Sequence, residues 1–139
     1  MTKVVKTDKA PGAIGPYSQG IDIGNMIFFS GQIPLDPETG VMPEGIEAQT
    51  RRALDNVKGL LESQNLTFKN VVKTTVFLDN INDFATMNGI YAEYFEEPYP
   101  ARSAVEVAKL PKGALLEVEV VAVKKTFSSE KVFFLCLKP

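Results

Sequence analysis

Arg102 and two of the glutamates, Glu117 and Glu119, stand among apolar residues in the stretch PARSAVEVAKLPKGALLEVEV, residues 100–120. The β-branched and aliphatic residues around them predict two strands, at 101–108 and 115–124. An ionised side chain in such surroundings is costly unless an opposite charge or hydrogen bonds compensate it. Arg102 therefore needs an anion, and Glu117 and Glu119 on the following strand are candidates for it.

Two kinds of partner for Arg102 are compatible with this pattern. In the simpler one, Arg102 forms an ion pair with Glu117 or Glu119 on a solvated face of the sheet. A hairpin through residues 110–113 would set Glu106 opposite Glu117, and like charges in that position are destabilising. Either the two strands are not neighbours, or Arg102 meets its anion elsewhere, across a subunit boundary or on a ligand.

The chain contains no histidine, which limits the chemistry available to it. Ser-His-Asp and Cys-His nucleophilic sites cannot be built within it, and zinc sites made from His and Cys are equally excluded. Acid–base work falls to Glu, Asp, Tyr, Lys or ordered water, and we predict neither a metal nor a cofactor. The net charge of −2 argues against a nucleic-acid-binding surface, which normally shows a basic face.

With 139 residues the chain has the length of one domain, which we place at 1–125, with an extension at 126–139. The single cysteine, Cys136, allows no internal disulfide, and the N-terminal residues lack the apolar core of a secretory signal. No stretch approaches the roughly 20 apolar residues of a membrane span. We therefore expect a cytoplasmic protein, whose apolar segment 132–137 packs against a subunit and keeps Cys136 buried, away from the site.

Hydrophobic periodicity and turn residues predict six strands and two helices. The strands are expected at 4–6, 20–23, 26–31, 71–78, 101–108 and 115–124, and the helices at 46–64 and, from an Asn82 cap, to about residue 95. Gly89 lies inside the second helix, where it costs roughly 1 kcal/mol relative to alanine, so we expect packing or a close approach to require it. The order β-β-β-α-β-α-β-β is typical of an α+β fold with two helices on one face of a mixed sheet.

Several of these strands are apolar on both faces, as in the pairs Phe28 and Phe29 or Val120 and Val121. Two helices can cover only one face of the sheet. A partner subunit is the simplest cover for the other face, so we expect an oligomer.

Seven segments complete the pattern: IGPYSQG (14–20), SGQIP (30–34), LDNVKGLL (54–61), VVKTTVFL (71–78), INDFATMN (81–88), PARSAVEVAKLPKG (100–113) and LEVEVVAV (116–123). Most of them have an ordinary structural explanation when taken alone, turn chemistry in the first two. Together, and in this order, they resemble the RidA (YjgF) family of reactive intermediate deaminases. The PARS-x-VEVA-x-LPKG block is the most specific part of the resemblance, which covers residues 6–125.

The resemblance implies a homotrimer of subunits with a chorismate-mutase-like fold, sheets packed inward, helices outward and a cleft at each subunit boundary. It implies hydrolysis of 2-imino acids, such as 2-iminobutanoate and 2-iminopropanoate, to 2-keto acids and ammonia. At the matching positions, Arg102 would bind the substrate carboxylate and Glu117 would orient or activate the attacking water. The pocket would be lined by Tyr17, the backbone at Ser30 and Gly31, Asn88 and Ala104.

Ala104 departs from the family pattern, since many members have cysteine at this position. Activity is expected only if the residue serves through its backbone. Two other functions stay open: a binding protein for keto acids that uses the same cleft without turnover, and a translation inhibitor or ribonuclease, as some family members are labelled. The acidic composition and the absence of histidine count against RNA cleavage.

Overall fold

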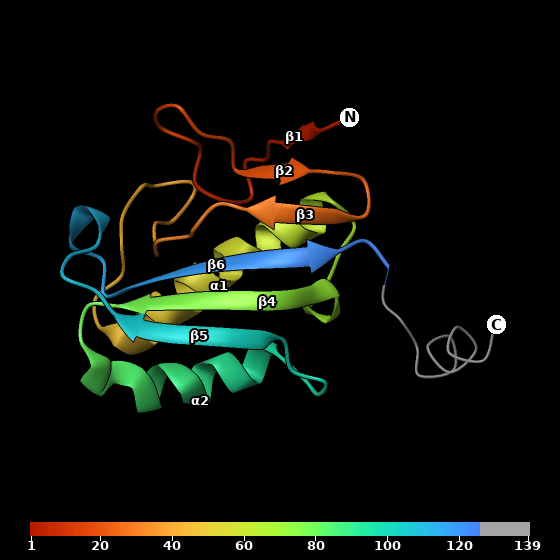
Figure 1. Ribbon diagram of the computed structural model, residues 1–139. Helices are drawn as coiled ribbons and strands as arrows, with labels where there is room; N and C mark the ends of the chain where they lie inside the picture. The colour runs from red at the N-terminus through yellow and green to blue at the C-terminus, as the bar shows by residue number, and fades with distance from the viewer. Residues whose placement is uncertain (126–139) are drawn as a thin grey trace.

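A mixed sheet of six strands forms one layer of the protein, and two helices form the other (Figure 1). The computed structural model describes residues 1–125. The strands are β1 (Lys3–Val5), β2 (Gly20–Asp22), β3 (Met26–Phe29), β4 (Val71–Leu78), β5 (Ala101–Glu106) and β6 (Leu116–Val123). The helices are α1 (Ile46–Ser63) and α2 (Phe84–Tyr94), and the short 3₁₀ turns are η1 (Phe68–Asn70), η2 (Ile81–Asp83) and η3 (Pro111–Gly113). The predicted order of elements and the α+β class are confirmed.

The strand order across the sheet is β1-β2-β3-β6-β4-β5. β4 and β5 pair in parallel, and the helix α2 connects them as a crossover. The other neighbouring strands pair antiparallel. Because β4 lies between β5 and β6, these two strands do not form a hairpin. Phe77, not Glu106, lies opposite Glu117. Of the two alternatives for Arg102, the one in which its strand does not neighbour that of Glu117 is therefore confirmed.

α1 supplies much of the core, because its apolar residues recur every three or four positions and form one stripe. The buried members of that stripe are Ala53, Leu54, Val57, Leu60 and Leu61. They join the inward-facing residues of the sheet, such as Ile27, Val76 and Val118, in one cluster. Full burial of a valine, leucine or isoleucine side chain stabilises the fold by roughly 1.5–3 kcal/mol.

The start of α2 differs from the prediction. Asn80, not Asn82, is the capping residue: its side chain accepts a hydrogen bond from the N–H of Asn82 at 2.9 Å and begins η2, which leads into α2. The sequence offers two asparagines two residues apart, and the η2 turn explains why the earlier one is used. The inner face is as predicted, with Met87, Ile90 and Tyr91 buried.

Gly89 has open space where a Cβ would lie. Within residues 1–125 of one chain no packing requires a glycine at this position, so the expected close approach is not found there.

The face of the sheet opposite the helices is not covered by any element within residues 1–125 (Figure 1). Its apolar side chains include Phe28, which is 47% exposed, and Val105, which is 45% exposed. Strand pairing places Ile21, Val121 and Phe77 on the same face. The two-sided apolar pattern of the sequence thus corresponds to a sheet with one open face.

None of the helices in the described part of the chain has the length and apolar character needed to cross a membrane. The predictions made for residues 126–139, including Cys136, lie outside the described residues.

Candidate active site

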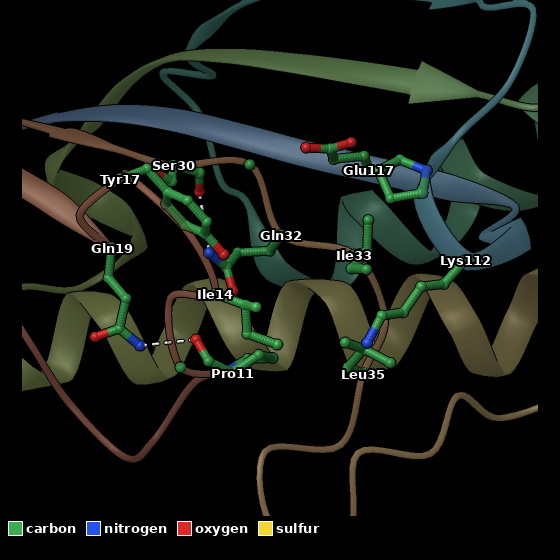
Figure 2. A pocket seen from close by; sticks show the side chains of 13 residues that line it. Pro11, Ile14, Tyr17, Gln19, Ser30, Gln32, Ile33, Leu35, Lys112 and Glu117 are labelled. Atoms are coloured by element: carbon green, nitrogen blue, oxygen red, sulfur yellow. Dashed lines mark hydrogen bonds between the residues drawn. The ribbon is translucent and has the colours of Figure 1, made fainter.

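A cavity of about 540 Å³ opens beside the first residues of β6 (Figure 2). Its walls come from the loop between β1 and β2, from the segment that follows β3, and from the turn η3. The lining residues are Pro11, Gly12, Ile14, Tyr17, Gln19, Ser30, Gly31, Gln32, Ile33, Leu35, Pro111, Lys112 and Glu117. Four residues predicted for the site, Tyr17, Ser30, Gly31 and Glu117, are therefore brought together.

Glu117 contributes the carboxyl group of this cavity. Its side chain is half-buried on the open face of the sheet, two residues from Glu119 on the same strand face. Burial raises the pKa of Glu117 above its ordinary value, and repulsion from Glu119 raises it further. A carboxylate with a raised pKa is a stronger base, and this suits it to accept a proton from water. Residues 1–125 contain no group of three acidic, cysteine or histidine side chains that could hold a metal ion.

Gly31 lies directly against the side chain of Glu117. A Cβ on Gly31 would be 2.9 Å from Glu117 Cδ and 3.1 Å from its Cγ, closer than such atoms normally approach, and would overlap Oε1. The glycine thus provides the space in which the carboxyl group lies. The N–H of Gly31 forms no hydrogen bond with the backbone of the described residues, so it is available to a ligand or a water.

The loop that carries Tyr17 is fixed by hydrogen bonds on both sides. Gln19 is buried, and its Nε2 donates to the carbonyl oxygen of Pro11 at 2.8 Å. Ser30 Oγ donates to the carbonyl oxygen of Ser18 at 2.6 Å. Tyr17 itself remains 52% exposed at the rim of the cavity, where its ring is accessible to a bound molecule.

Gln32 joins the cavity wall to β6. Its backbone N–H donates to the carbonyl oxygen of Val118 at 2.8 Å, and its carbonyl oxygen accepts from the N–H of Val118 at 3.0 Å. Its Nε2 donates to the carbonyl oxygen of Ser30 at 3.0 Å. Backbone pairing next to Glu117 therefore sets how close Gly31 lies to the carboxyl group.

Arg102 lies elsewhere, on the outermost strand β5. Its guanidinium carbon is 4.7 Å from the centroid of the Tyr91 ring and 5.4 Å from that of Phe84, both on α2. Its Nη1 donates to Oδ1 of Asn88 at 2.7 Å. Within residues 1–125 it forms no ion pair, and its Nε and Nη2 have no hydrogen-bond partner. The guanidinium is thus oriented while two of its nitrogens remain available for a carboxylate.

The ring of Tyr91 helps to hold the guanidinium of Arg102 in place. Its hydroxyl group lies 2.8 Å from Oγ1 of the buried Thr74, and burial raises the pKa of Tyr91. The phenol therefore stays neutral, and its ring is held where a guanidinium can stack on it.

Arg102 and Glu117 do not meet within one chain. β4 separates their strands, which places them about 10 Å apart across the sheet at about 4.8 Å per strand. They also lie on opposite faces, because Arg102 contacts α2 and Glu117 lies on the open face. The predicted residues therefore form two groups. Asn88 lies with Arg102, and Ala104 lies two residues farther along β5, packed against the core rather than in the cavity.

Some residues of the site were not found from the sequence. Gln19 and Gln32 lie inside the motifs IGPYSQG and SGQIP. An amide next to turn residues indicates a side chain that is buried and hydrogen-bonded to the backbone of the loop. Phe84 was not singled out, and Tyr91 was predicted only as an inner-face residue of its helix. The sequence predicts Lys112 only as part of a turn, and nothing in the local sequence indicates that it lines a cavity.

Comparisons with known proteins bear on this site. The family described as Endoribonuclease L-PSP matches residues 7–124. The 2-iminobutanoate/2-iminopropanoate deaminase of Escherichia coli strain K12 is 52% identical over 128 residues, which cover 90% of this chain and 100% of the relative. A RutC family protein of Pyrococcus abyssi is 53% identical over 124 residues, covering 88% of this chain and 98% of the relative.

Solved structures agree with the observed fold. The YjgF gene product of E. coli has a TM-score of 0.84 at 52% identity and covers 88% of this chain and 99% of that one. E. coli TdcF with bound serine has a TM-score of 0.85 at 48% identity, with the same coverage of 88% and 99%. The chain therefore belongs to the endoribonuclease L-PSP family, the family of the RidA (YjgF) deaminases that its sequence resembles.

Proposed function

We propose that the protein hydrolyses reactive 2-imino acids, such as 2-iminobutanoate and 2-iminopropanoate, to 2-keto acids and ammonia. The strongest support for this reaction comes from two groups suited to it: the guanidinium of Arg102, which has free nitrogens, and the half-buried carboxyl group of Glu117. The names of relatives from E. coli and Salmonella typhimurium, which are 52% and 50% identical to this chain, point to the same substrates.

The chemistry follows from these two groups. Arg102 binds the substrate carboxylate through its free nitrogens and so fixes the C2 atom. Glu117 accepts a proton from a water molecule as the water oxygen bonds to C2 and the C=N double bond becomes single. That proton passes to the nitrogen, so that C2 carries a hydroxyl and an amino group. The hydroxyl proton then moves to the nitrogen through Glu117 as the C–N bond breaks, so that ammonia leaves and the C2 oxygen forms the keto group. The reaction consumes one water and requires no redox group.

The N–H of Gly31 and the ring of Tyr17 complete the pocket around the reacting atoms. The free N–H can stabilise the oxygen that becomes bonded to C2, and Tyr17 at the rim restricts access to it. TdcF, whose structure contains bound serine, supports a pocket for a small molecule of the amino-acid type.

A complete site requires a second copy of the chain, because the two groups lie apart in one subunit. The open apolar face of the sheet is the surface on which copies would pack. In a homotrimer with sheets inward, the β5 edge of one subunit lies beside the cavity of the next, and Arg102 reaches Glu117 across the boundary. Asn88 and Ala104 then enter the site together with Arg102, Ala104 through its backbone.

The test is a direct assay of ammonia and keto acid released from 2-iminobutanoate generated in the reaction mixture. We expect turnover well above the uncatalysed rate, and loss of it in Arg102→Ala. Binding of 2-oxobutanoate without turnover would indicate a binding protein instead, and degradation of RNA in a parallel reaction would indicate a nuclease.

A further inference from the structure

The turn η3 brings a second charge to the cavity, one that the mechanism above does not use. Lys112 lines the cavity together with Glu117, whereas Ile14, Ile33 and Leu35 make much of the remaining wall apolar. Figure 2 shows the Lys112 side chain directed toward Leu35 and away from the Glu117 carboxylate. Within residues 1–125 its amine forms no ion pair, so it is available to a ligand.

The backbone of Lys112 is unusual for a lysine. Its φ of 57° and ψ of 23° are left-handed, a conformation that favours glycine and asparagine over residues with longer side chains. The neighbouring Gly113 also has a positive φ, 69°. The turn itself therefore gives no reason for a lysine at position 112. The position of the Lys112 amine over the apolar wall of the cavity does give a reason.

We infer that Lys112 binds a second anionic group of the substrate, so that the site prefers imino acids with a carboxylate on the side chain over uncharged ones of equal length. This rests on the proposed function, in which Arg102 of a second copy takes the carboxylate at C1 and Glu117 faces C2. The side chain of the substrate then crosses the apolar wall toward Lys112. The cavity has room for this, since about 540 Å³ lies within the range of pockets that hold ligands much larger than a four-carbon acid.

Two stable keto acids of equal chain length provide the probe. 2-Oxopentanedioate has the distal carboxylate and 2-oxopentanoate lacks it, so the ratio of their dissociation constants isolates that group. We would measure both by calorimetry at low ionic strength for the wild type, Lys112→Asn and Lys112→Arg. Asparagine removes the charge but accepts the left-handed backbone, so the variant should fold, and thermal denaturation checks this. Lys109→Asn is the matched control, because Lys109 is exposed and lies outside the cavity.

The wild type should bind 2-oxopentanedioate more tightly than 2-oxopentanoate. Lys112→Asn should reduce that preference about five- to tenfold, as expected for a partly exposed charge-assisted contact. Lys112→Arg should keep most of the preference, Lys109→Asn should keep all of it, and added salt should weaken it. An unchanged ratio in Lys112→Asn, an equal loss for both acids, or no binding of either acid would each overturn the inference.

The proposed function fails separately. Ammonia release from 2-iminobutanoate by the wild type reports on the deaminase reaction and not on Lys112. A protein that binds the dicarboxylate through Lys112 but releases no ammonia would refute the reaction and leave the anion subsite standing.

Discussion

The guanidinium of Arg102 is placed by two aromatic rings and one amide, and this makes its shape as important as its charge. Tyr91 and Phe84 stack on the planar group, and Asn88 accepts from one nitrogen. A lysine at this position would keep the charge but lose the stacking and the paired donors. We therefore expect Arg102→Lys to lower kcat/KM for 2-iminobutanoate by at least about 100-fold, nearly as much as Arg102→Ala.

Arg51→Lys is the matched control for that change. Arg51 forms a surface ion pair with Glu93 at 3.0 Å, and pairs of this kind contribute little. Its activity should stay within about twofold of the wild type. If Arg102→Lys also retains most of the activity, Arg102 acts only as a general positive charge, and the proposal that its paired nitrogens bind the substrate carboxylate is wrong.

Glu117 should act as a base, and its raised pKa makes this testable by pH. The carboxyl group must be ionised to accept a proton, so kcat should fall as the pH drops through a midpoint above the ordinary value for glutamate. Glu117→Gln should remove this limb and lower kcat by about 100-fold or more, with a much smaller effect on the binding of 2-oxobutanoate. Glu119→Gln, two residues away, should be tolerated far better. Equal losses in binding and turnover would make Glu117 a structural residue.

The same shift predicts an effect on stability. Because the folded-state pKa of Glu117 is raised, the folded protein binds more protons than the unfolded chain between the two pKa values. Stability therefore falls as the pH rises through that window and stays lower above it. Glu117→Gln should thus melt at a higher temperature than the wild type at neutral pH, while it loses activity.

Gly31 offers a way to move the carboxylate without changing it. A Cβ at this position would meet Glu117 Cδ at 2.9 Å, so the glutamate side chain must shift in Gly31→Ala. Displacement of a catalytic group by about 1 Å can cost about 100-fold in rate. We expect kcat to fall by this order, with a melting temperature close to that of the wild type. A fully active Gly31→Ala would show that the observed position of Glu117 is not the working one.

At the scale of elements, two helical glycines should respond in opposite ways to alanine. Gly89 in α2 has open space at its Cβ position, so Gly89→Ala should raise the free energy of unfolding by up to about 1 kcal/mol. Gly59 in α1 faces the backbone of Lys9, whose carbonyl carbon would be 2.9 Å from a new Cβ. Gly59→Ala should therefore lower the free energy of unfolding by about 1–3 kcal/mol. Urea denaturation measures both, and a destabilising Gly89→Ala would mean that a surface absent from one chain packs against it.

The elements were predictable where their signal is local. The helical stripe of α1 was expected at 46–64 and runs from Ile46 to Ser63, and β4 was expected at 71–78, where it lies. Strand order was not predictable, because inserting β6 between β3 and β4 depends on contacts between segments far apart in the chain. The resemblance named Tyr17, Ser30, Gly31 and Glu117 of the cavity, but not its other lining residues. The separation of the site into one group of residues around Glu117 and another around Arg102 was not predictable, because it follows from that strand order.

At the scale of the whole molecule, the open face of the sheet and the divided site call for the same partner. Exposed Phe28 and Val105 lie on the face that carries Glu117, and Arg102 lies at the β5 edge of that sheet. One packing of identical subunits would cover the apolar face and bring each Arg102 to the Glu117 of a neighbour. We therefore propose that every active site belongs to two chains.

Mixing two inactive variants tests that claim most directly. Arg102→Ala and Glu117→Gln, co-expressed with different tags and purified as mixed trimers by both tags, should regain deaminase activity although each alone is inactive. Each mixed trimer has two chains of one variant and one of the other, so one of its three sites receives both an intact Arg102 and an intact Glu117, and about a third of the wild-type rate is expected. Light scattering must show three 15.2 kDa chains in each preparation. Mixed trimers that remain as inactive as their parents would contradict the shared site.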